Sequence, residues 1–258
     1  MDAELLLAHA LGVNRLRLYL DYDRPLSEDE RVNYRELVRR RALREPVALI
    51  TGWKEFWSLQ VSITPGVLIP RPETELLIEV ILEESRDILN CSLLEIGCGS
   101  GALFCAIASE RQDVILYACD ISLIALKCAS YNASRLVTSD QVYMFASDLL
   151  KSVRPGPLFD IIYSNPPYIP SEMINSLDPE IRDFEPKCAL DGGFDGLETI
   201  RRVIVMSRSR LKPKGKIIME IGDEQSKDVT EFLKLNEFSG IKTYVDLAGK
   251  HRVIKAVR

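Results

Sequence analysis

Short apolar runs alternate with segments of helical periodicity through most of the chain after residue 75. The apolar runs have the length and composition of buried strands, and the periodic segments are typical of amphipathic helices. Strands that alternate with helices predict a mostly parallel sheet that is covered by helices on both faces. The expected strands are 93–96, 114–119, 142–146, 159–164 and 215–221, and the expected helices are 76–82, 101–108, 122–132, 198–210 and 223–235.

The end of the chain breaks this alternation. Residues 241–245 and 252–257 read as two strands with no helix between them. We expect them to form an antiparallel pair at the edge of the sheet. The fold class is therefore α/β, with a doubly wound, mostly parallel sheet of seven strands, a Rossmann-like arrangement.

The first 45 residues have helix-like apolar spacing that is interrupted by Gly12 and Pro25. Ser27 followed by Glu30 three residues later is a capping-box pattern, which predicts the start of a helix. A unit of this size buries too little surface to be very stable alone. Residues 1–45 are predicted to form a small helical domain, which either caps the larger domain or grips a macromolecular partner.

Between residues 46 and 65 the pattern changes to period two. Such alternation predicts a strand or hairpin. One face would carry Trp57, Leu59, Val61 and Ile63.

The helix that follows opens the larger domain. Pro70 and Pro72 are expected to keep Arg71 extended, and Thr74 can cap the helix. We assign residues 46–72 to a linking β-hairpin and residues 73–258 to the larger domain.

Composition and charge are those of an ordinary globular protein. The chain has 258 residues, 47% of them hydrophobic and 28% charged, with a net charge of −5. This charge argues against strong nonspecific attraction to nucleic acid, which depends on clustered Lys and Arg. The one basic stretch, residues 31–44, is either a solvated helix face or a partner-docking surface.

The cysteine and histidine content excludes several site types. Six cysteines without C-x-x-C spacing are interpreted as reduced core residues of a cytoplasmic protein. With only His9 and His251, a zinc site or a histidine-based triad has little support. The chain has no run of 18 apolar residues and its start has no basic region, so we expect neither a membrane span nor a secretory leader.

The stretch Asn165-Pro166-Pro167-Tyr168 directly follows the expected strand 159–164. In open α/β sheets the ligand crevice lies beyond the carboxyl ends of the strands. Two prolines supply no backbone N–H, so this loop offers carbonyl acceptors and one side-chain amide. It is suited to a planar NH2 group, with Asn165 Oδ1 and the carbonyl of Pro166 as acceptors and Tyr168 against the face. The alternative is a proline-stiffened turn without chemistry.

A glycine-rich turn, Glu95-Ile96-Gly97-Cys98-Gly99-Ser100-Gly101, joins the first sheet strand to its helix. Such a turn lets the backbone come close to a ligand at the helix N-terminus, and is shared by dinucleotide and nucleoside-cofactor enzymes. Asp120 closes the next strand, where an acid can accept hydrogen bonds from ribose hydroxyls. Asp148, just past the third strand, offers an acceptor for an adenine amino group, or is a turn residue.

The glycine turn, the strand-ending Asp120 and the N-P-P-Y stretch, in this order, resemble the class I S-adenosylmethionine-dependent methyltransferases that modify planar amino groups. Further stretches look like the peptide chain release factor glutamine methyltransferase family, over nearly the whole chain. They are residues 2–9, 52–57, 68–75, 189–197 and 246–252. Members of that family usually carry one more helix ahead of the position where this sequence begins.

This resemblance implies transfer of a methyl group from S-adenosylmethionine to the side-chain amide nitrogen of the glutamine in the Gly-Gly-Gln loop of class 1 release factors. It implies that the amide is held by Asn165, Pro166, Pro167 and Tyr168. The cofactor would be held by Glu95, Ile96, Gly97, Cys98, Gly99, Gly101, Asp120, Asp148 and Asn165. The implied partner is a release factor, with no membrane and no direct nucleic acid binding.

Two side chains between the domains have open roles. Arg71 and Glu73 either line a substrate channel or form a structural salt bridge. Phe56 and Trp57 are interpreted as hairpin core in preference to a substrate platform.

Three other functions compete with this reading. An amino methyltransferase acting on adenine or guanine in DNA or RNA would share N-P-P-Y, but such enzymes extrude a base and usually add basic or aromatic surfaces. A nicotinamide-dependent oxidoreductase would share the glycine turn. A noncatalytic cofactor-binding module would have no use for the acceptor loop at Asn165.

Overall fold

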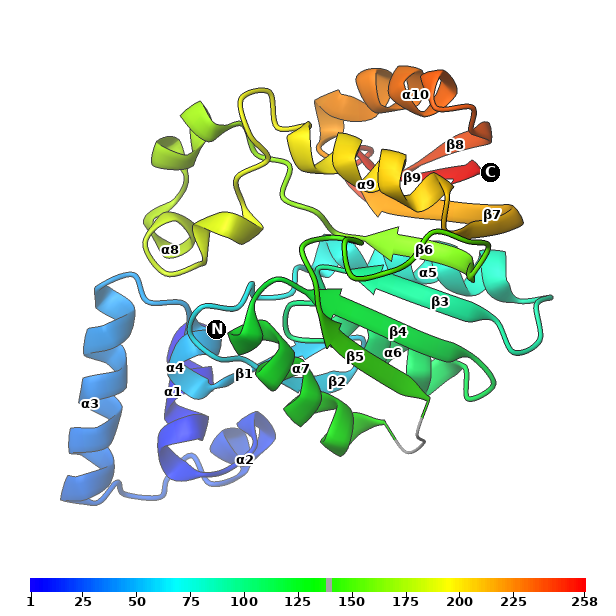
Figure 1. Ribbon diagram of the computed structural model, residues 1–258. Coiled ribbons are helices and arrows are strands. Elements are labelled where there is room, and N and C mark those ends of the chain that lie inside the picture. Colours follow the sequence, from blue (N-terminus) through cyan, green and yellow to red (C-terminus); the bar gives the residue numbers. More distant parts are fainter. Residues whose placement is uncertain (138–140) are drawn as a thin grey trace.

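The computed structural model describes residues 1–137 and 141–258, and its centre is a seven-stranded sheet (Figure 1). The strand order is β5-β4-β3-β6-β7-β9-β8. The first five pair in parallel, whereas β9 pairs antiparallel with β7 and with β8, as expected for the edge. The strands are β3 (Ser92–Ile96), β4 (Ile115–Asp120), β5 (Val142–Ala146), β6 (Phe159–Ser164), β7 (Leu211–Glu220), β8 (Ser239–Val245) and β9 (His251–Val257).

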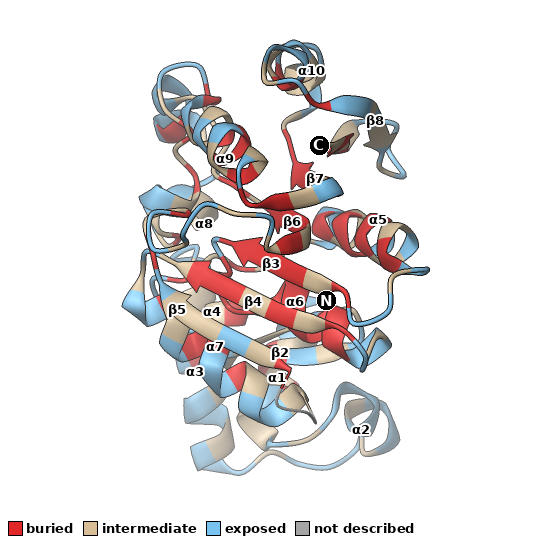
Figure 2. Ribbon diagram, turned by 45° about the vertical axis from the view of Figure 1, so that its right-hand side comes forward, coloured by how far each residue is buried: buried red, intermediate tan, exposed pale blue. Residues whose placement is uncertain are grey.

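Helices cover the sheet on both faces, which confirms the doubly wound arrangement. Helices α5 (Glu75–Ser85), α6 (Ala102–Glu110) and α7 (Leu123–Leu136) pack on one face, and α9 (Glu198–Arg208) and α10 (Ser226–Leu235) pack on the other. Strand β3 is buried from both sides (Figure 2), because Leu93 belongs to the first of these cores and Leu94 to the second.

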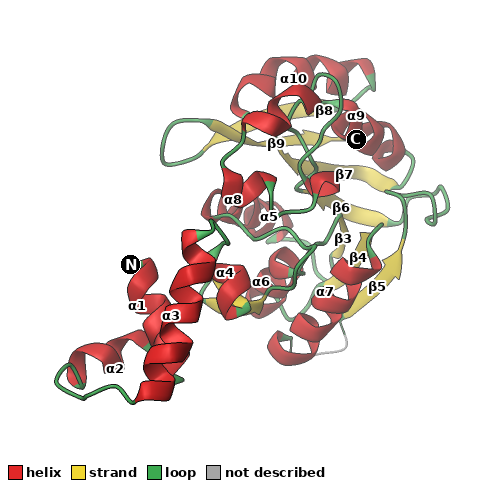
Figure 3. Cartoon of the chain, turned by 90° about the vertical axis from the view of Figure 1, so that its left-hand side faces the viewer, coloured by secondary structure: helices red, strands yellow, loops and turns green. Residues whose placement is uncertain are grey.

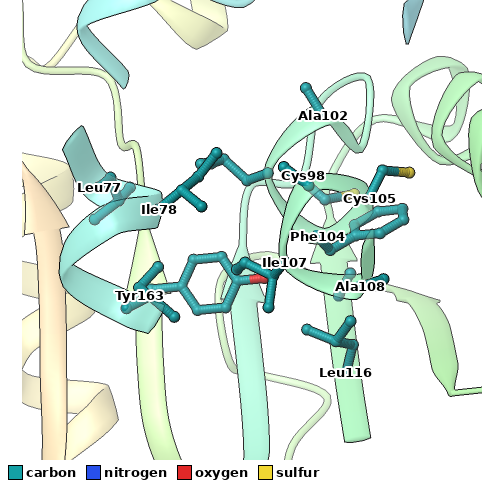
Figure 4. Close-up of a cluster of buried hydrophobic side chains, with 14 of the residues drawn as sticks. Leu77, Ile78, Cys98, Ala102, Phe104, Cys105, Ile107, Ala108, Leu116 and Tyr163 are labelled. Carbon is teal, nitrogen blue, oxygen red and sulfur yellow. The ribbon is translucent and has the colours of Figure 1, made fainter. Parts of the chain in front are cut away.

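Tyr163 of β6 extends the first core. Its ring is fully buried and lies between α5 and α6, close to Ile78 and Ile107 (Figure 4). The hydroxyl donates a hydrogen bond to Glu95 Oε2 at 3.1 Å. A polar pair is therefore enclosed in an apolar layer next to the glycine turn.

The chain turns back on itself at the middle of the sheet. After β3 it moves outward through β4 and β5, and then returns to place β6 on the other side of β3. In such sheets the ligand crevice lies where the order reverses, beyond the carboxyl ends of the strands. Here those ends are Ile96 of β3 and Ser164 of β6, which pair with each other.

Four short helices form the N-terminal unit, which projects from the sheet (Figure 3). They are α1 (Asp2–Leu11), α2 (Arg15–Leu20), α3 (Glu28–Ala42) and α4 (Val47–Thr51). Leu6, Leu37 and Ile50 form their small buried core. Both hydrogen bonds of the expected capping box are present, from Ser27 N to Glu30 Oε2 and from Glu30 N to Ser27 Oγ.

The linking hairpin is confirmed, but its details differ from the period-two pattern. It consists of β1 (Trp53–Phe56) and β2 (Leu59–Ser62), and α4 stands where only extended chain was expected. Trp57 was wrongly placed on a strand face. Trp57 and Ser58 form the turn, both with positive φ, and a two-residue turn of this hand matches the twist of a hairpin.

Thr74 does not cap α5. A 3-10 turn, η1 (Pro72–Thr74), precedes the helix, and the Thr74 side chain makes no capping hydrogen bond. Its hydroxyl oxygen instead accepts a hydrogen bond from Asn165 Nδ2 at 3.3 Å. Arg71 is extended, with φ −100° and ψ 143°, as its two flanking prolines predict.

The segment between β6 and α9 was not resolved into elements from the sequence. It contains the 3-10 turns η2 (Ser171–Ser176) and η3 (Lys187–Ala189) and a single helical turn, α8 (Pro179–Arg182). An isolated bridge between Ile169 and Asp191 closes the segment into a loop beside the crevice. In Figure 1 this loop lies above the N-terminal helices.

The basic stretch of α3 is neutralised within the chain. Its arginines form ion pairs with carboxylates, most of them in the N-terminal unit and one, Glu180, in α8. The pairs are Arg31 and Arg35 with Glu28, Arg39 with Glu36, Arg40 with Glu45, Arg41 with Asp2 and Glu180, and Arg44 with Glu180.

All six cysteines are free thiols. Five are buried, as expected for core residues, and Cys188 is exposed. Among the residues that the structure describes, no helix has the length and apolar character needed to cross a bilayer.

Candidate functional site

A cavity of about 270 Å³ lies at the carboxyl ends of β3, β4 and β6. Its walls come from the glycine turn, the end of β4 and the N-P-P-Y stretch. Its sides are closed by Gly66, Val67, Leu68, Pro70, Pro186, Cys188, Ala189, Thr199 and Arg202. Sequence-distant segments therefore meet at the position that the sheet order predicts for a ligand.

The glycine turn is open toward the cavity. Gly97 and Gly99 have positive φ, and a Cβ added at either would meet no atom within 4 Å. Free space at both positions lets a ligand approach the backbone closely. Gly101 is different, because an added Cβ would lie 2.5 Å from the Phe104 ring. Gly101 thus serves the packing of α6, and it is not among the cavity-lining residues.

Asp120 ties the two neighbouring loops together. Its Oδ2 accepts a hydrogen bond from Gly99 N at 2.9 Å, and its Oδ1 accepts one from Ser122 N at 2.8 Å. A carboxylate can accept about four hydrogen bonds, so both oxygens retain capacity for hydroxyl groups of a ligand. Asp120 lines the cavity, as expected.

Glu95 is the fully buried acid of the turn and also lines the cavity. Burial raises the pKa of its carboxyl well above the usual value, which the hydrogen bond from Tyr163 opposes. Oε1 forms no hydrogen bond of good geometry, although the backbone N–H of Phe104 lies close enough to the carboxyl to lower its pKa. Buried polar atoms are rarely left unpaired, so Oε1 has capacity to accept a hydrogen bond from this N–H or from a bound molecule.

Asp148 lines the cavity from the end of β5, but its carboxylate is already paired. Lys151 Nζ lies 2.5 Å from Oδ2 and Arg202 Nη2 lies 2.9 Å from Oδ1. These partners lower the pKa of Asp148, the lysine most strongly. An adenine amino group would share this carboxylate with Arg202, a residue of α9 that sequence reasoning did not identify.

Asn165, Pro166 and Pro167 line the cavity opposite the glycine turn. Pro166 is buried, and the described peptide bonds are all trans. Because Asn165 Nδ2 donates to Thr74 Oγ1, Oδ1 remains available as an acceptor. Ser164 anchors the start of the loop by donating from Oγ to the carbonyl of Ile96 at 2.7 Å.

Tyr168 lies outside the cavity lining. Its hydroxyl donates to Glu220 Oε1 at 3.2 Å, and its ring packs against the core on the α9 and α10 face. Gln225 Nε2 donates to the carbonyl of Tyr168 at 2.9 Å, which fixes the backbone at this point. Stacking of Tyr168 on a substrate amide stays a prediction.

Arg71 forms a salt bridge with Glu185 and is not among the cavity-lining residues. Of the two roles left open by the sequence, the structural salt bridge is present for Arg71, with Glu185 as partner, whereas Glu73 neither lines the cavity nor pairs with Arg71. Glu185 Oε2 also accepts from Ile69 N at 3.3 Å, so the pair fastens the loop after β6 to the chain before α5. Phe56 is buried in the core and touches the cavity, whereas Trp57 donates from Nε1 to Glu110 at 2.8 Å.

Several residues at the site gave no usable signal in the sequence. Thr74 was interpreted as a cap, and Glu220 as part of a strand end. Gln225 and Glu185 act through partners more than 50 positions away. Such pairings become visible only when the sheet register is known, because no local pattern encodes them.

Two family descriptions match the sequence. Residues 1–52 match the PrmC N-terminal domain, and residues 72–176 match the methyltransferase small domain. Among curated relatives, the release factor glutamine methyltransferase of Rhodopirellula baltica is 40% identical, over 98% of this chain and 88% of the relative. The protein of the same name from Koribacter versatilis is 39% identical, over 98% of this chain and 89% of the relative.

Solved structures share the fold at low identity. A methyltransferase from Pyrococcus furiosus has a TM-score of 0.55 and 17% identity, covering 87% of this chain and 98% of that chain. The ribosomal protein L11 methylase from Lactobacillus delbrueckii subsp. bulgaricus has a TM-score of 0.53 and 20% identity, covering 77% and 84%. Both likenesses concern the arrangement of the sheet and its helices.

Proposed function

Because the chain belongs to the family of release factor glutamine methyltransferases, which are S-adenosylmethionine-dependent protein-glutamine N-methyltransferases, we propose its substrate and its site residues. The substrate is the glutamine in the Gly-Gly-Gln motif of class 1 peptide chain release factors, methylated on its side-chain nitrogen. Since its partners act in translation, the enzyme works in the cytoplasm.

One observation carries this proposal. Asn165, Pro166 and Pro167 line the same cavity as Gly97, Gly99 and most of the glycine turn, Gly101 excepted. A loop rich in acceptors thus faces a turn suited to a nucleoside ligand. A carboxamide NH2 group has two donors, which match Asn165 Oδ1 and the carbonyl of Pro166.

Residues of the glycine turn and of the two strand ends fit the cofactor. The open space at Gly97 and Gly99 lets the cofactor lie close to the backbone of the turn. The unpaired Oε1 of Glu95 accepts a hydrogen bond from the cofactor. Asp120 accepts from the ribose hydroxyls, and Asp148 accepts from the adenine amino group. Ile96 and Cys98 complete the wall, and Gly101 maintains the turn from beneath.

Alignment is the main catalytic task of the protein residues. Bound S-adenosylmethionine supplies a methyl group that its sulfonium already activates. An amide nitrogen is a weak nucleophile, because its lone pair is delocalised into the carbonyl. Acceptors at Asn165 and Pro166 that hold both N–H groups favour pyramidal nitrogen and direct the lone pair. No dedicated general base is needed, since the amide proton becomes acidic only as the new N–C bond forms and can then pass to water.

The remaining segments receive supporting roles. Residues 1–45 dock the release factor, residues 46–72 link the two parts, and residues 73–258 carry out the transfer. Arg71 contributes to substrate binding from outside the cavity, through its salt bridge to Glu185 in the loop after β6. Tyr168 supports the acceptor loop through its hydrogen bond to Glu220, and its stacking on the substrate amide is part of the proposal.

Mass spectrometry of a release factor after incubation with enzyme and methyl-labelled cofactor tests the substrate. We expect one added methyl group on the glutamine of Gly-Gly-Gln and none on a factor in which that glutamine is replaced by alanine. DNA and RNA are offered in parallel reactions. Methylation of a nucleic acid with an unmodified release factor would assign the enzyme to the competing class of adenine or guanine methyltransferases.

A further inference from the structure

Glu220 is a buried acid directly behind the N-P-P-Y stretch. It ends β7, the parallel neighbour of β6, and the register pairs Met219 with Ser164. The residues that follow are Glu220, the last of β7, and Asn165, the first after β6, so both stand at the carboxyl edge of the sheet. Glu220 is only 2% exposed and does not line the cavity.

The Glu220 carboxyl is connected to both ends of the acceptor loop, residues 165–168, directly at Tyr168 and through Thr74 at Asn165. Tyr168 donates its hydroxyl proton to Oε1 at 3.2 Å. Thr74 lies close enough to the same carboxyl to lower its pKa, and the Thr74 hydroxyl oxygen accepts from Asn165 Nδ2 at 3.3 Å. Oε2 forms no hydrogen bond of good geometry and is buried. The proton of Thr74 therefore has a nearby acceptor with free capacity.

An ionised carboxylate can only accept hydrogen bonds, which gives this chain of groups a direction. Thr74 has one hydroxyl proton, and when it points to Glu220 the oxygen of Thr74 can only accept. Asn165 must then turn Nδ2 toward Thr74 and Oδ1 toward the cavity. A side-chain amide that turned the other way would present a donor to the donor groups of a carboxamide substrate.

We propose that Glu220 is a positioning residue which, through Thr74, fixes the orientation of the Asn165 side-chain amide, and through Tyr168 holds the far end of the same loop. This inference rests on the proposed function, since it concerns the group that accepts the substrate amide. Glu220 touches neither substrate nor cofactor. The effect of Glu220 is to determine whether Asn165 turns its Oδ1 or its Nδ2 toward the cavity.

Glu220 changes its charge state near neutral pH. Burial raises its pKa to about 7, and Glu73 adds to the rise. The hydrogen bonds of Thr74 and Tyr168 and the charge of Arg252 oppose it. Arg252 is itself paired with Asp246 at 3.1 Å. Once protonated, Glu220 can donate as well as accept, and the direction of the chain of hydrogen bonds is lost.

Kinetics of four variants test the relay through turnover. Glu220→Gln keeps the shape but supplies a donor, and Thr74→Val removes the hydroxyl at constant volume. Each is expected to lower kcat by roughly tenfold or more through misorientation, with KM for the cofactor near the wild-type value. Thr74→Ser is expected to recover most of the turnover lost in Thr74→Val. The variant that combines Glu220→Gln with Thr74→Val is expected to have a kcat no lower than that of the slower of these two single variants.

The pH profile separates positioning from a merely structural role. Wild-type kcat is expected to rise with a midpoint near pH 7, where Glu220 ionises, and the profile of Glu220→Gln is expected to be flat. Glu84→Gln is the matched control, since Glu84 is a partly buried carboxyl paired with Lys216 and Lys255 at the opposite end of α5. That variant is expected to keep the wild-type profile.

A second measurement needs no turnover. In protein with ¹⁵N-labelled asparagine, the side-chain amide resonances of Asn165, assigned by their absence in Asn165→Ala, are expected to titrate with a midpoint near pH 7. In Glu220→Gln they are expected not to titrate. Wild-type turnover by Glu220→Gln, additive loss in the double variant, or pH-independent Asn165 resonances would each overturn the proposal. Failure of the wild-type enzyme to methylate a release factor would instead overturn the substrate assignment, and the resonances would still decide the relay.

Discussion

Buried carboxyls at the site carry a cost in stability. The pKa of Glu220 is raised from 4.5 to about 7 in the folded protein. Between these two values the folded state keeps a proton that the unfolded state has released, so the free energy of unfolding falls as pH rises through the window. A shift of this size corresponds to about 3 kcal/mol above pH 7. Burial is the main cause.

The first prediction concerns this cost. Urea unfolding at pH 5 and pH 8 is expected to show that the stability of Glu220→Gln relative to wild type increases by about 2 to 3 kcal/mol between the two pH values. The reason is that the amide has no proton to lose. A difference between the two proteins that does not change with pH would contradict a neutral Glu220 in the folded state at pH 5.

The second prediction concerns Asn165. Replacing it with alanine is expected to lower single-turnover methylation by about 100-fold, as for the loss of one preorganised hydrogen-bond partner in a transition state. Binding of S-adenosylhomocysteine, measured by calorimetry, is expected to change much less. Near-normal methylation by Asn165→Ala would refute the assigned role.

Residues with a local signature were found from the sequence, and residues with distant partners were not. Gly97, Gly99 and Asp120 were identifiable because turns and strand ends have their own composition, and they do line the cavity. Thr74 was misread as a cap, because its actual partner, Asn165, lies 91 positions away. The cofactor-binding roles of Gly97, Gly99 and Asp120 stay predictions.

At the scale of elements, one buried side chain joins three segments. Asn132 of α7 is fully buried, and its Oδ1 accepts from Ser62 N at 2.8 Å. Its Nδ2 donates to the carbonyls of Ser62 and Ser100, both at 2.9 Å. The hairpin and the glycine turn are thus fastened to the same helix, and loss of this amide leaves backbone groups unpaired.

The third prediction follows. Asn132→Ala is expected to lower the free energy of unfolding by about 3 kcal/mol in urea denaturation, because buried donors and acceptors lose their partner. Affinity for S-adenosylhomocysteine is expected to fall as well, since Ser100 belongs to the glycine turn. Asn33→Ala, which removes one exposed hydrogen bond to the carbonyl of Ala10, is the matched control and should change stability little.

Strands were predicted more accurately than irregular segments. The seven sheet strands were found because apolar runs between helices have few other interpretations, although β7 begins four residues before the expected position 215. The period-two prediction for residues 46–65 failed at two places, at helix α4 and at the turn of Trp57. The loop from 169 to 197 has neither period, because its elements are single turns held by tertiary contacts.

At the scale of the whole molecule, an ion pair joins the N-terminal helices to the loop after β6. Arg41 Nη1 of α3 lies 2.7 Å from Glu180 Oε1 of α8, and Arg44 approaches the same oxygen at 3.9 Å. Together with the pair of Arg71 and Glu185, this connection sets the position of the loop relative to the N-terminal unit. A large partner that contacts both the N-terminal unit and this loop is expected to bind more weakly when the ion pair is removed.

The fourth prediction tests that connection. Glu180→Gln is expected to raise KM for a release factor by about threefold without changing kcat, since a partly exposed ion pair contributes little energy. Glu36→Gln is the control, because Glu36 pairs with Arg39 within α3. Equal KM values for the two variants would argue against a shared docking surface.

The hairpin has an optical consequence. The chain contains two tryptophans, Trp53 in β1 and Trp57 in the turn, and both are half-buried where the helical unit meets the sheet. Intrinsic fluorescence is therefore a local signal from this junction. We expect the emission maximum to shift when a docked protein rearranges the junction. Binding of a protein to the unlabelled enzyme can therefore be followed by stopped-flow fluorescence.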